Sequence, residues 1–285
     1  MFKKFIPLIF VLLWSTGFIG AKFGLPYAST GDFLAIRTFA NIAVFLLLIF
    51  LLKQPRLTVQ QIGHAMVTGL LIHGAYLGGV FAAIEAGIPA GLTAIIVGLQ
   101  PLFTAMLAML LLKAVVSRAQ WLALFLGLAG LILVVSASLD LTDVSVDALF
   151  FAFVALVGIT FGTLYQKQFC QKQPLLPAVC WQYVASLLVF IPLVLTGESQ
   201  PIQWQLEFVL SLTWLVLGLS VVAMLLLMYM VEQGDAAKVT AYFYLVPPVT
   251  AIEAWLLFDE QLALSSIIGM MLCALSVYVV TKKNA

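Results

Sequence analysis

Charged residues are scarce in this chain: Asp, Glu, Lys and Arg make up 9% of its 285 residues, against about a quarter in soluble domains. Hydrophobic residues make up 64%, and the mean hydropathy is +1.17. No water-soluble fold hides so much apolar surface, so we expect the lipid bilayer to be the solvent. The formal net charge is +1 and nucleic-acid-binding motifs are absent, so we expect no nucleic-acid partner.

Motifs of catalysis and metal binding are also missing. There is no H-E-x-x-H, no G-x-S-x-G and no pair of intramembrane aspartates, and the histidines number two; we therefore do not expect an enzyme. The lack of a P-loop excludes an ATP-driven pump built from this chain alone. Cys170, Cys180 and Cys273 lie in or beside apolar runs without CxxC spacing. Free cysteines of this kind are packing residues, and we expect neither a metal site nor a cofactor.

Long apolar runs dominate what remains. A bilayer core about 30 Å thick needs roughly 20 apolar residues per helix. Measured against that length, the predicted spans are residues 5–23, 32–52, 60–84, 90–112, 119–138, 147–166, 176–196, 207–231, 236–258 and 262–281. The first run is longer than the core of a signal peptide and no clear A-x-A site follows it, so we interpret it as a retained span.

The basic residues sort to one side of these spans. If the N-terminus is cytoplasmic, eleven of the thirteen Lys and Arg residues fall in cytoplasmic segments, whereas the opposite loops hold mainly Asp and Glu. This is the pattern that the positive-inside rule requires. One missing span would destroy the sorting, so we predict ten helices with both termini in the cytoplasm.

An internal repeat divides the chain near its middle. The string PLFTAMLAMLLL, from Pro101, matches PPVTAIEAWLLF, from Pro247, at six of twelve positions, which sets an offset of 146 residues. Chance similarity between apolar strings is the alternative. Each repeat would hold five spans, and an odd number makes the second copy enter the membrane from the opposite side. We therefore predict an all-α integral membrane protein with ten transmembrane helices in two inverted five-helix repeats, residues 1–138 and 139–285.

Several strings resemble the EamA-type ten-helix carriers of the drug/metabolite transporter superfamily. They are Trp14-Ser15-Thr16-Gly17, Ile36-Arg37-Thr38-Phe39-Ala40, AGLTAIIVGLQPLFTAML, AYFYLVPPVTAIEAWLLFDE and QLALSSIIGMMLCALSVYVV. The resemblance implies a basket in which helices 1–4 and 6–9 line a cavity, and export of small metabolites, often amino acids. In that family each repeat commonly ends its fourth helix with an acid. Glu260 fits this position, but its counterpart in the first repeat is Ala114.

Prolines interrupt two of the predicted spans. Pro101 and Pro247, the latter followed by Pro248, fall near the middle of spans 4 and 9. A proline inside a helix frees the carbonyl four residues earlier, and a freed carbonyl at membrane depth must face protein or a wet cavity. We interpret these prolines as breaks in cavity-lining helices; a plain packing kink is the alternative.

Two charged residues lie within spans. Glu253 must be paired, solvated by a cavity or protonated. We hypothesise that it couples protons or binds a substrate amine; a snorkelling or structurally paired residue is the alternative. Arg37 lies at a similar depth, so an Arg37–Glu253 pair is one hypothesis. The forked guanidinium group of Arg37 also suits a substrate carboxylate, with lipid snorkelling as the alternative.

The other candidate side chains are polar or aromatic. His73 lies mid-span beside Gly74 and Gly78, either as a hydrogen-bonding residue or as a proton relay. Further residues at cavity depth are Trp14, Ser15, Tyr76, Gln100, Tyr165, Trp181, Gln182, Tyr242 and Tyr244. Individually, many would be explained by core packing and interfacial belts. Such a wall with few charges suits amphipathic or zwitterionic solutes and disfavours strongly anionic ones.

Together these features predict a secondary transporter in a bacterial inner membrane that exports a small-molecule substrate, an amino acid or a related compound, by alternating access. Proton antiport and facilitated export are both open. The alternatives are a multidrug or toxic-compound exporter and, less favoured, a channel-like facilitator, which would need a continuous pore, usually from several subunits. Nothing in the sequence indicates an oligomeric state.

Overall fold

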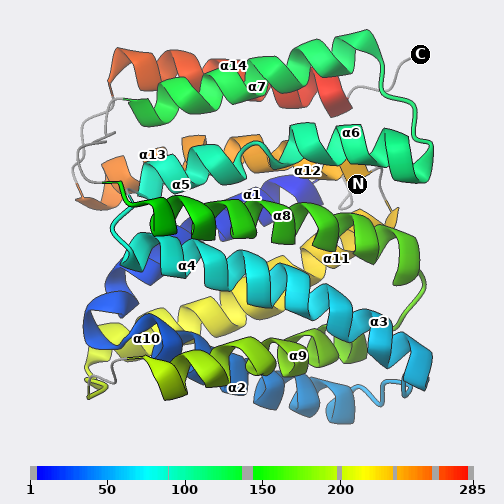
Figure 1. Ribbon diagram of the computed structural model, residues 1–285, viewed down its shortest axis with the longest axis vertical. Helices are drawn as coiled ribbons and strands as arrows, with labels where there is room; N and C mark the ends of the chain where they lie inside the picture. The colour runs from blue at the N-terminus through cyan, green and yellow to red at the C-terminus, as the bar shows by residue number, and fades with distance from the viewer. Residues whose placement is uncertain are drawn as a thin grey trace.

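Helices cross the molecule side by side from one end to the other (Figure 1). The computed structural model describes residues 5–88, 90–136, 144–197, 201–233, 236–258 and 263–281. Among these residues, eight helical stretches are long and apolar enough to cross a membrane. The first span, which has a shorter apolar stretch from Ile6 to Gly17, and the interrupted ninth bring the set to ten. The predicted all-α class and the ten spans are confirmed.

The observed spans agree with the predicted ranges to within a few residues. Six are single helices: α1 (Ile6–Gly24), α2 (Thr30–Leu51), α7 (Arg118–Ser136), α8 (Val146–Phe169), α9 (Leu175–Thr196) and α14 (Leu264–Thr281). The other four are composite: α3 (Val59–Gly69), η3 (Leu70–Leu77) and α4 (Gly78–Glu85); α5 (Ala90–Val97) and α6 (Gln100–Leu112); α10 (Leu206–Trp214), η4 (Leu215–Ala223) and α11 (Met224–Gln233); α12 (Ala236–Ala241), η5 (Tyr242–Leu245) and α13 (Val246–Phe258).

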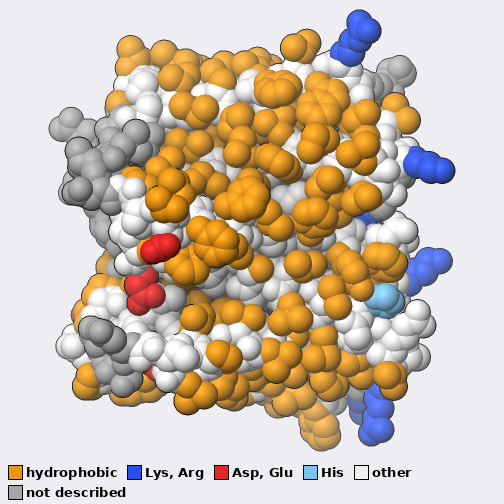
Figure 2. Space-filling view, viewed as in Figure 1, with side chains coloured by type: hydrophobic (Ala, Val, Ile, Leu, Met, Phe, Trp, Pro, Cys, Tyr) orange, Lys and Arg blue, Asp and Glu red, His pale blue; other side chains and the backbone are white. Residues whose placement is uncertain are grey.

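The outer surface has the composition of a lipid-facing protein. Hydrophobic side chains cover most of the face in Figure 2, and large ones such as Phe50, Leu195 and Leu122 are more than 70% exposed. Lys and Arg gather at the end of the molecule where α1 begins and α14 ends, and Asp and Glu appear at the opposite end (Figures 1 and 2). Such an apolar band between a basic end and an acidic end is the distribution expected of a membrane protein that follows the positive-inside rule.

Helix packing follows the internal repeat. Two pairs of equivalent spans pack on each other: α2 on α9, and α7 on α14. The other contacts are exchanged between the halves, because the span α3–η3–α4 packs on α8 while its equivalent, α10–η4–α11, packs on α1. A two-fold relation between the halves produces this exchange. The predicted division between residues 138 and 139 lies outside the described residues.

The irregular segments also recur at the repeat offset. Spans 3 and 8 each contain a π-helical stretch, η3 and η4, where the backbone is wider than an α-helix. Spans 4 and 9 are each interrupted: α5 ends at Val97 before α6 begins at Gln100, and the 3₁₀ turn η5 separates α12 from α13. Pro101 lies in the first turn of α6 and Pro247 in the first turn of α13. A proline is tolerated there because its missing N–H would have no helical partner.

Close contact between spans 3 and 7 depends on Gly69. A Cβ atom at this position would overlap the backbone of Gln182 in α9, and backbone cannot move aside as a side chain can. We expect Gly69→Ala to force the two spans apart and lower the free energy of unfolding by about 1–3 kcal/mol. Thermal unfolding of the detergent-solubilised protein measures this.

Gly63 supplies the matched control because it lies in the same helix, α3, and a Cβ atom added there would meet nothing within 4 Å. Gly63→Ala should leave stability unchanged or raise it by up to about 1 kcal/mol through helix propensity. Equal melting temperatures for the two variants would contradict the assigned contact.

Candidate functional site

A pocket lies between the two halves of the chain. Its empty space, counted together with its open mouth, is about 750 Å³. Spans 1, 2 and 3 of the first half, the turn after span 1, and spans 7 and 8 of the second half supply its wall: Trp14, Gly17, Leu25, Arg37, Ile72, His73, Tyr76, Leu77, Val80, Phe81, Ile84, Tyr183, Leu219, Ser220 and Met224. Both π-helical stretches, η3 and η4, contribute to this wall.

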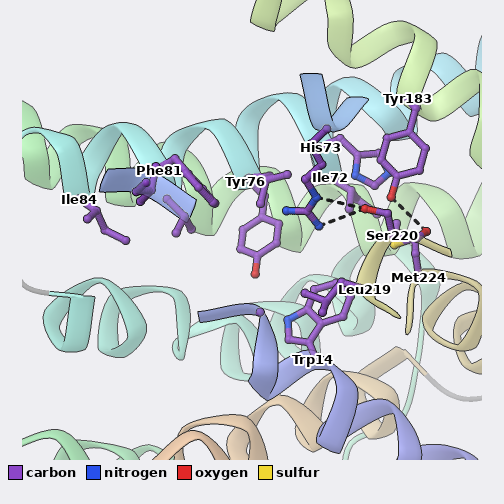
Figure 3. A pocket seen from close by; sticks show the side chains of 15 residues that line it. Trp14, Ile72, His73, Tyr76, Phe81, Ile84, Tyr183, Leu219, Ser220 and Met224 are labelled. Carbon is purple, nitrogen blue, oxygen red and sulfur yellow. Dashed lines mark hydrogen bonds between the residues drawn. The ribbon is translucent and has the colours of Figure 1, made fainter. Parts of the chain in front are cut away.

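One end of the pocket is polar and the other apolar. Figure 3 places His73, Tyr183 and Ser220 together at one end and Phe81 and Ile84 at the other. Tyr76 lies between them and projects into the space that Trp14 approaches from the opposite wall. The arrangement is complementary to an amphipathic molecule with a polar head and an apolar body.

Arg37 belongs to the polar end and is nearly buried, with 7% of its surface exposed. Its Nε and Nη2 atoms donate to the Oγ atom of Ser220 at 3.2 and 3.1 Å. The Tyr183 hydroxyl donates to the Ser220 backbone carbonyl at 3.2 Å, and the Tyr183 ring stacks on the His73 ring with centroids 4.2 Å apart. Tyr183 is the repeat equivalent of Arg37, so equivalent positions of α2 and α9 both bind the same residue of η4.

A second pocket adjoins the first. Its empty space is about 490 Å³, and it shares Trp14, Tyr76 and Val80 with the first pocket. The interrupted spans line it: Gly98 and Gln100 lie at the break in span 4, and Pro247 lies at the break in span 9. Both helix breaks therefore face an internal space, where backbone groups freed from the helix can be solvated.

Each residue of the Trp14-Ser15-Thr16-Gly17 string has a different role in the structure. Trp14 lines both pockets. The Ser15 hydroxyl donates to Oε1 of Glu253 at 2.7 Å, and Thr16 Oγ1 accepts from Nε1 of Trp214 at 2.8 Å. A Cβ atom at Gly17 would overlap the Leu219 side chain of η4. The string thus ties α1 to spans 8 and 9, both from the second half.

The hypothesis of an Arg37–Glu253 pair is wrong. Arg37 binds Ser220 and lines the first pocket, whereas Glu253 binds Ser15 and lines neither pocket. No ion pair joins either side chain to another described residue. The second carboxylate oxygen of Glu253, Oε2, is buried without a described hydrogen-bond partner.

The remaining candidates separate into pocket and packing positions. Gln100 lines the second pocket and its amide contacts Thr163 at 3.4 Å. Gln182 is fully buried and donates to Gln166 at 3.3 Å. Six other candidates line neither pocket: Tyr165, Trp181, Tyr242, Tyr244, Pro101 and Pro248. Glu260 lies outside the described residues.

Some residues of the site are absent from the candidates that the sequence indicates. Tyr183 and Ser220 hold the polar end together, and both carry a weak signal in the sequence: Tyr183 is the repeat equivalent of Arg37, and Ser220 is a polar residue within an apolar run.

The helices that line the two pockets differ from those that the family resemblance implies. The described part of α8, span 6, supplies no residue to these two pockets, whereas Leu131 of α7 lines the second.

Among known proteins, the model of one family matches this chain twice, once in each half. The model of the EamA-like transporter family matches residues 4–136 and again residues 147–282. The chain is 25% identical over 275 residues to the "Uncharacterized transporter YvbV" of Bacillus subtilis, covering 96% of this chain and 90% of the relative. It is 22% identical over 284 residues to a "Probable amino-acid metabolite efflux pump" of Salmonella typhimurium, covering 96% and 93%.

Two further matches agree with these. The chain is 24% identical over 269 residues to the "Uncharacterized inner membrane transporter YedA" of Escherichia coli, covering 92% of this chain and 86% of the relative. A solved structure described only as "Crystal structure of protein" superposes with a TM-score of 0.81 at 17% identity, covering 98% of this chain and 96% of that one. This last likeness concerns the fold alone.

Proposed function

Because the chain belongs to the EamA-like transporter family, we propose that it is a secondary exporter of small amphipathic metabolites that works by alternating access. The observation that carries the proposal is the pocket between the two halves, whose wall combines spans 1, 2 and 3 with spans 7 and 8. A site at the junction of two repeats opens to one side or the other as the halves move against each other.

The irregular segments supply places where that motion can occur. π-Helical stretches and proline breaks lack the regular hydrogen-bond ladder that makes a helix stiff. Here they occur in equivalent spans of both halves, at η3 and η4 and at the breaks beside Pro101 and Pro247. Equivalent flexible points in both halves favour a motion in which the halves exchange conformations.

The solute is proposed to be an amino acid or a related metabolite. Two features support this class: the pocket has a polar end around Arg37 and an aromatic and aliphatic wall, and one relative is named as a probable amino-acid metabolite efflux pump. A multidrug or toxic-compound exporter is the second candidate, supported by the same largely apolar wall.

The protein is a multi-pass inner-membrane protein, and we place both termini in the cytoplasm of a bacterial cell. Lys53 and Lys113 follow the last residues of α2 and α6, and Lys167 lies in the last turn of α8. These helices end at the side of the molecule where α1 begins (Figure 1), and this side would be cytoplasmic by the positive-inside rule. The first pocket extends toward Leu25 and Ile84, near the opposite end of spans 1 and 3.

Counterflow in proteoliposomes tests the carrier function. Vesicles loaded with unlabelled solute should accumulate the labelled solute transiently and saturably, because the unlabelled solute inside competes for the carrier and so slows the exit of the label. A panel of amino acids, their derivatives and drugs covers both solute classes. Flux that never saturates and shows no counterflow would identify a channel-like facilitator instead.

Glu253 is the proposed coupling residue, because its carboxylate lies within a span with Oε1 bound to Ser15 and Oε2 buried without a described partner. A carboxylate in this setting can take up and release a proton as its surroundings change. We expect Glu253→Gln to abolish the dependence of transport on a pH gradient while saturable counterflow persists. Ser136→Ala, at an exposed end of α7, is the control. An unchanged rate and pH dependence in Glu253→Gln would remove the coupling role.

A further inference from the structure

The polar end of the first pocket holds a cation without an anion. Arg37 keeps its positive charge under all ordinary conditions, and it is nearly buried at membrane depth. Two of its five N–H groups point to the neutral Ser220 hydroxyl, and no described residue accepts from the other three. A charge in such a place requires a partner, because an uncompensated buried ion costs several kcal/mol.

The walls of both pockets offer no negative side chain. Arg37 is the one charged residue among the described residues that line either of them. Glu253, the intramembrane acid, binds Ser15 outside the pockets. A bound molecule therefore finds a fixed positive charge but no fixed negative charge, which disfavours a ligand that carries its own ammonium group close to a carboxylate.

From this asymmetry we propose that the pocket selects small monocarboxylates with an uncharged, largely apolar body, such as amino-acid derivatives whose amine is masked or absent. The proposal rests on the exporter function and narrows its substrate class from amino acids and related metabolites to the related compounds that lack a charged amine. The carboxylate binds the free N–H groups of Arg37 in the fork geometry that guanidinium and carboxylate share. The body extends past Tyr76 toward Phe81 and Ile84, along the polar-to-apolar axis of the pocket (Figure 3).

The single positive charge of the site also limits how many negative charges a ligand can carry. One guanidinium neutralises one carboxylate, whereas a phosphate ester or a dicarboxylate would bring a second negative charge into the membrane interior without a partner. His73 does not supply a second cation, because it lines the same buried polar end as Arg37 and its protonation would place two positive charges side by side. The substrate class is thus limited to single negative charges.

Three ligands that share the phenylalanine side chain but differ in charge test the proposal on the unmodified protein. N-acetylphenylalanine carries a carboxylate alone, phenylalanine carries a carboxylate and an ammonium, and N-acetylphenylalanine amide carries no charge. Dissociation constants measured by calorimetry on the detergent-solubilised protein should be roughly 10- to 100-fold lower for N-acetylphenylalanine than for the other two, the range expected for hydrogen bonds to a charged group.

Matched variants identify the responsible cation. Arg37→Gln should abolish the preference for N-acetylphenylalanine, and Arg37→Lys, which keeps the charge without the fork, should retain part of it. Arg56→Gln, at an exposed position between α2 and α3, should retain all of it. Tighter or equal binding of phenylalanine, or an undiminished preference in Arg37→Gln, would overturn the proposal.

Counterflow with the same three ligands separates this proposal from the exporter function. Counterflow of N-acetylphenylalanine above that of the other two supports both. Binding that prefers N-acetylphenylalanine without any counterflow supports the carboxylate site and contradicts the carrier. Counterflow of phenylalanine at equal or higher rates supports the carrier and overturns the substrate class.

Discussion

Polar groups at membrane depth must find partners inside the protein, and most of this structure follows from that constraint. Backbone groups are satisfied within helices wherever a span faces lipid. The interruptions in spans 4 and 9 adjoin the second pocket, and the π-helical stretches of spans 3 and 8 line the first. Irregular backbone therefore occurs where the interior is polar or open. The same constraint makes the position of Arg37 informative, because its charge cannot be removed by deprotonation.

The two halves are related in architecture but not in chemistry. Equivalent spans share helix breaks and π-helical stretches, yet Arg37 has Tyr183 as its equivalent, and Ser220 has Gly74. Symmetry of the backbone allows the halves to exchange conformations. Asymmetry of the side chains gives the pocket one polar end and one apolar end. In the proposed mechanism, the repeat supplies the motion of the two halves, and the differences between its copies supply the selectivity for the solute.

The sequence predicts the spans and their interruptions well for a physical reason. Length and hydropathy decide whether a helix can cross a bilayer, and a proline removes a donor wherever it occurs. Partners across the pocket are harder to predict. The Arg37–Glu253 hypothesis relies on depth along the membrane, but depth does not fix the direction in which a side chain points around its helix. Successive residues turn by about 100°, and helix packing decides which of them meet.

Ser220 also illustrates why side-chain partners are hard to predict from the sequence. A serine in an apolar run is compatible with many environments, and its importance here comes from η4, which presents its hydroxyl to Arg37 and its carbonyl to Tyr183. The repeat offset is the available signal for Tyr183, since it maps Arg37 onto a polar aromatic residue. Neither the π-helical stretches nor the bond between Ser15 and Glu253 has a local sequence pattern that would identify it.

Alternating access requires the pocket to open to the two membrane faces in turn. Spin labels at exposed positions measure this most directly: one pair at Glu85 and Glu207, at one end of spans 3 and 8, and one pair at Gln60 and Gln233, at the other end, in a chain whose three buried cysteines are replaced. We expect two distance populations for each pair, with the long distance at one end accompanied by the short distance at the other when solute or pH shifts the balance. Distances that do not change, or that lengthen at both ends together, would contradict alternating access.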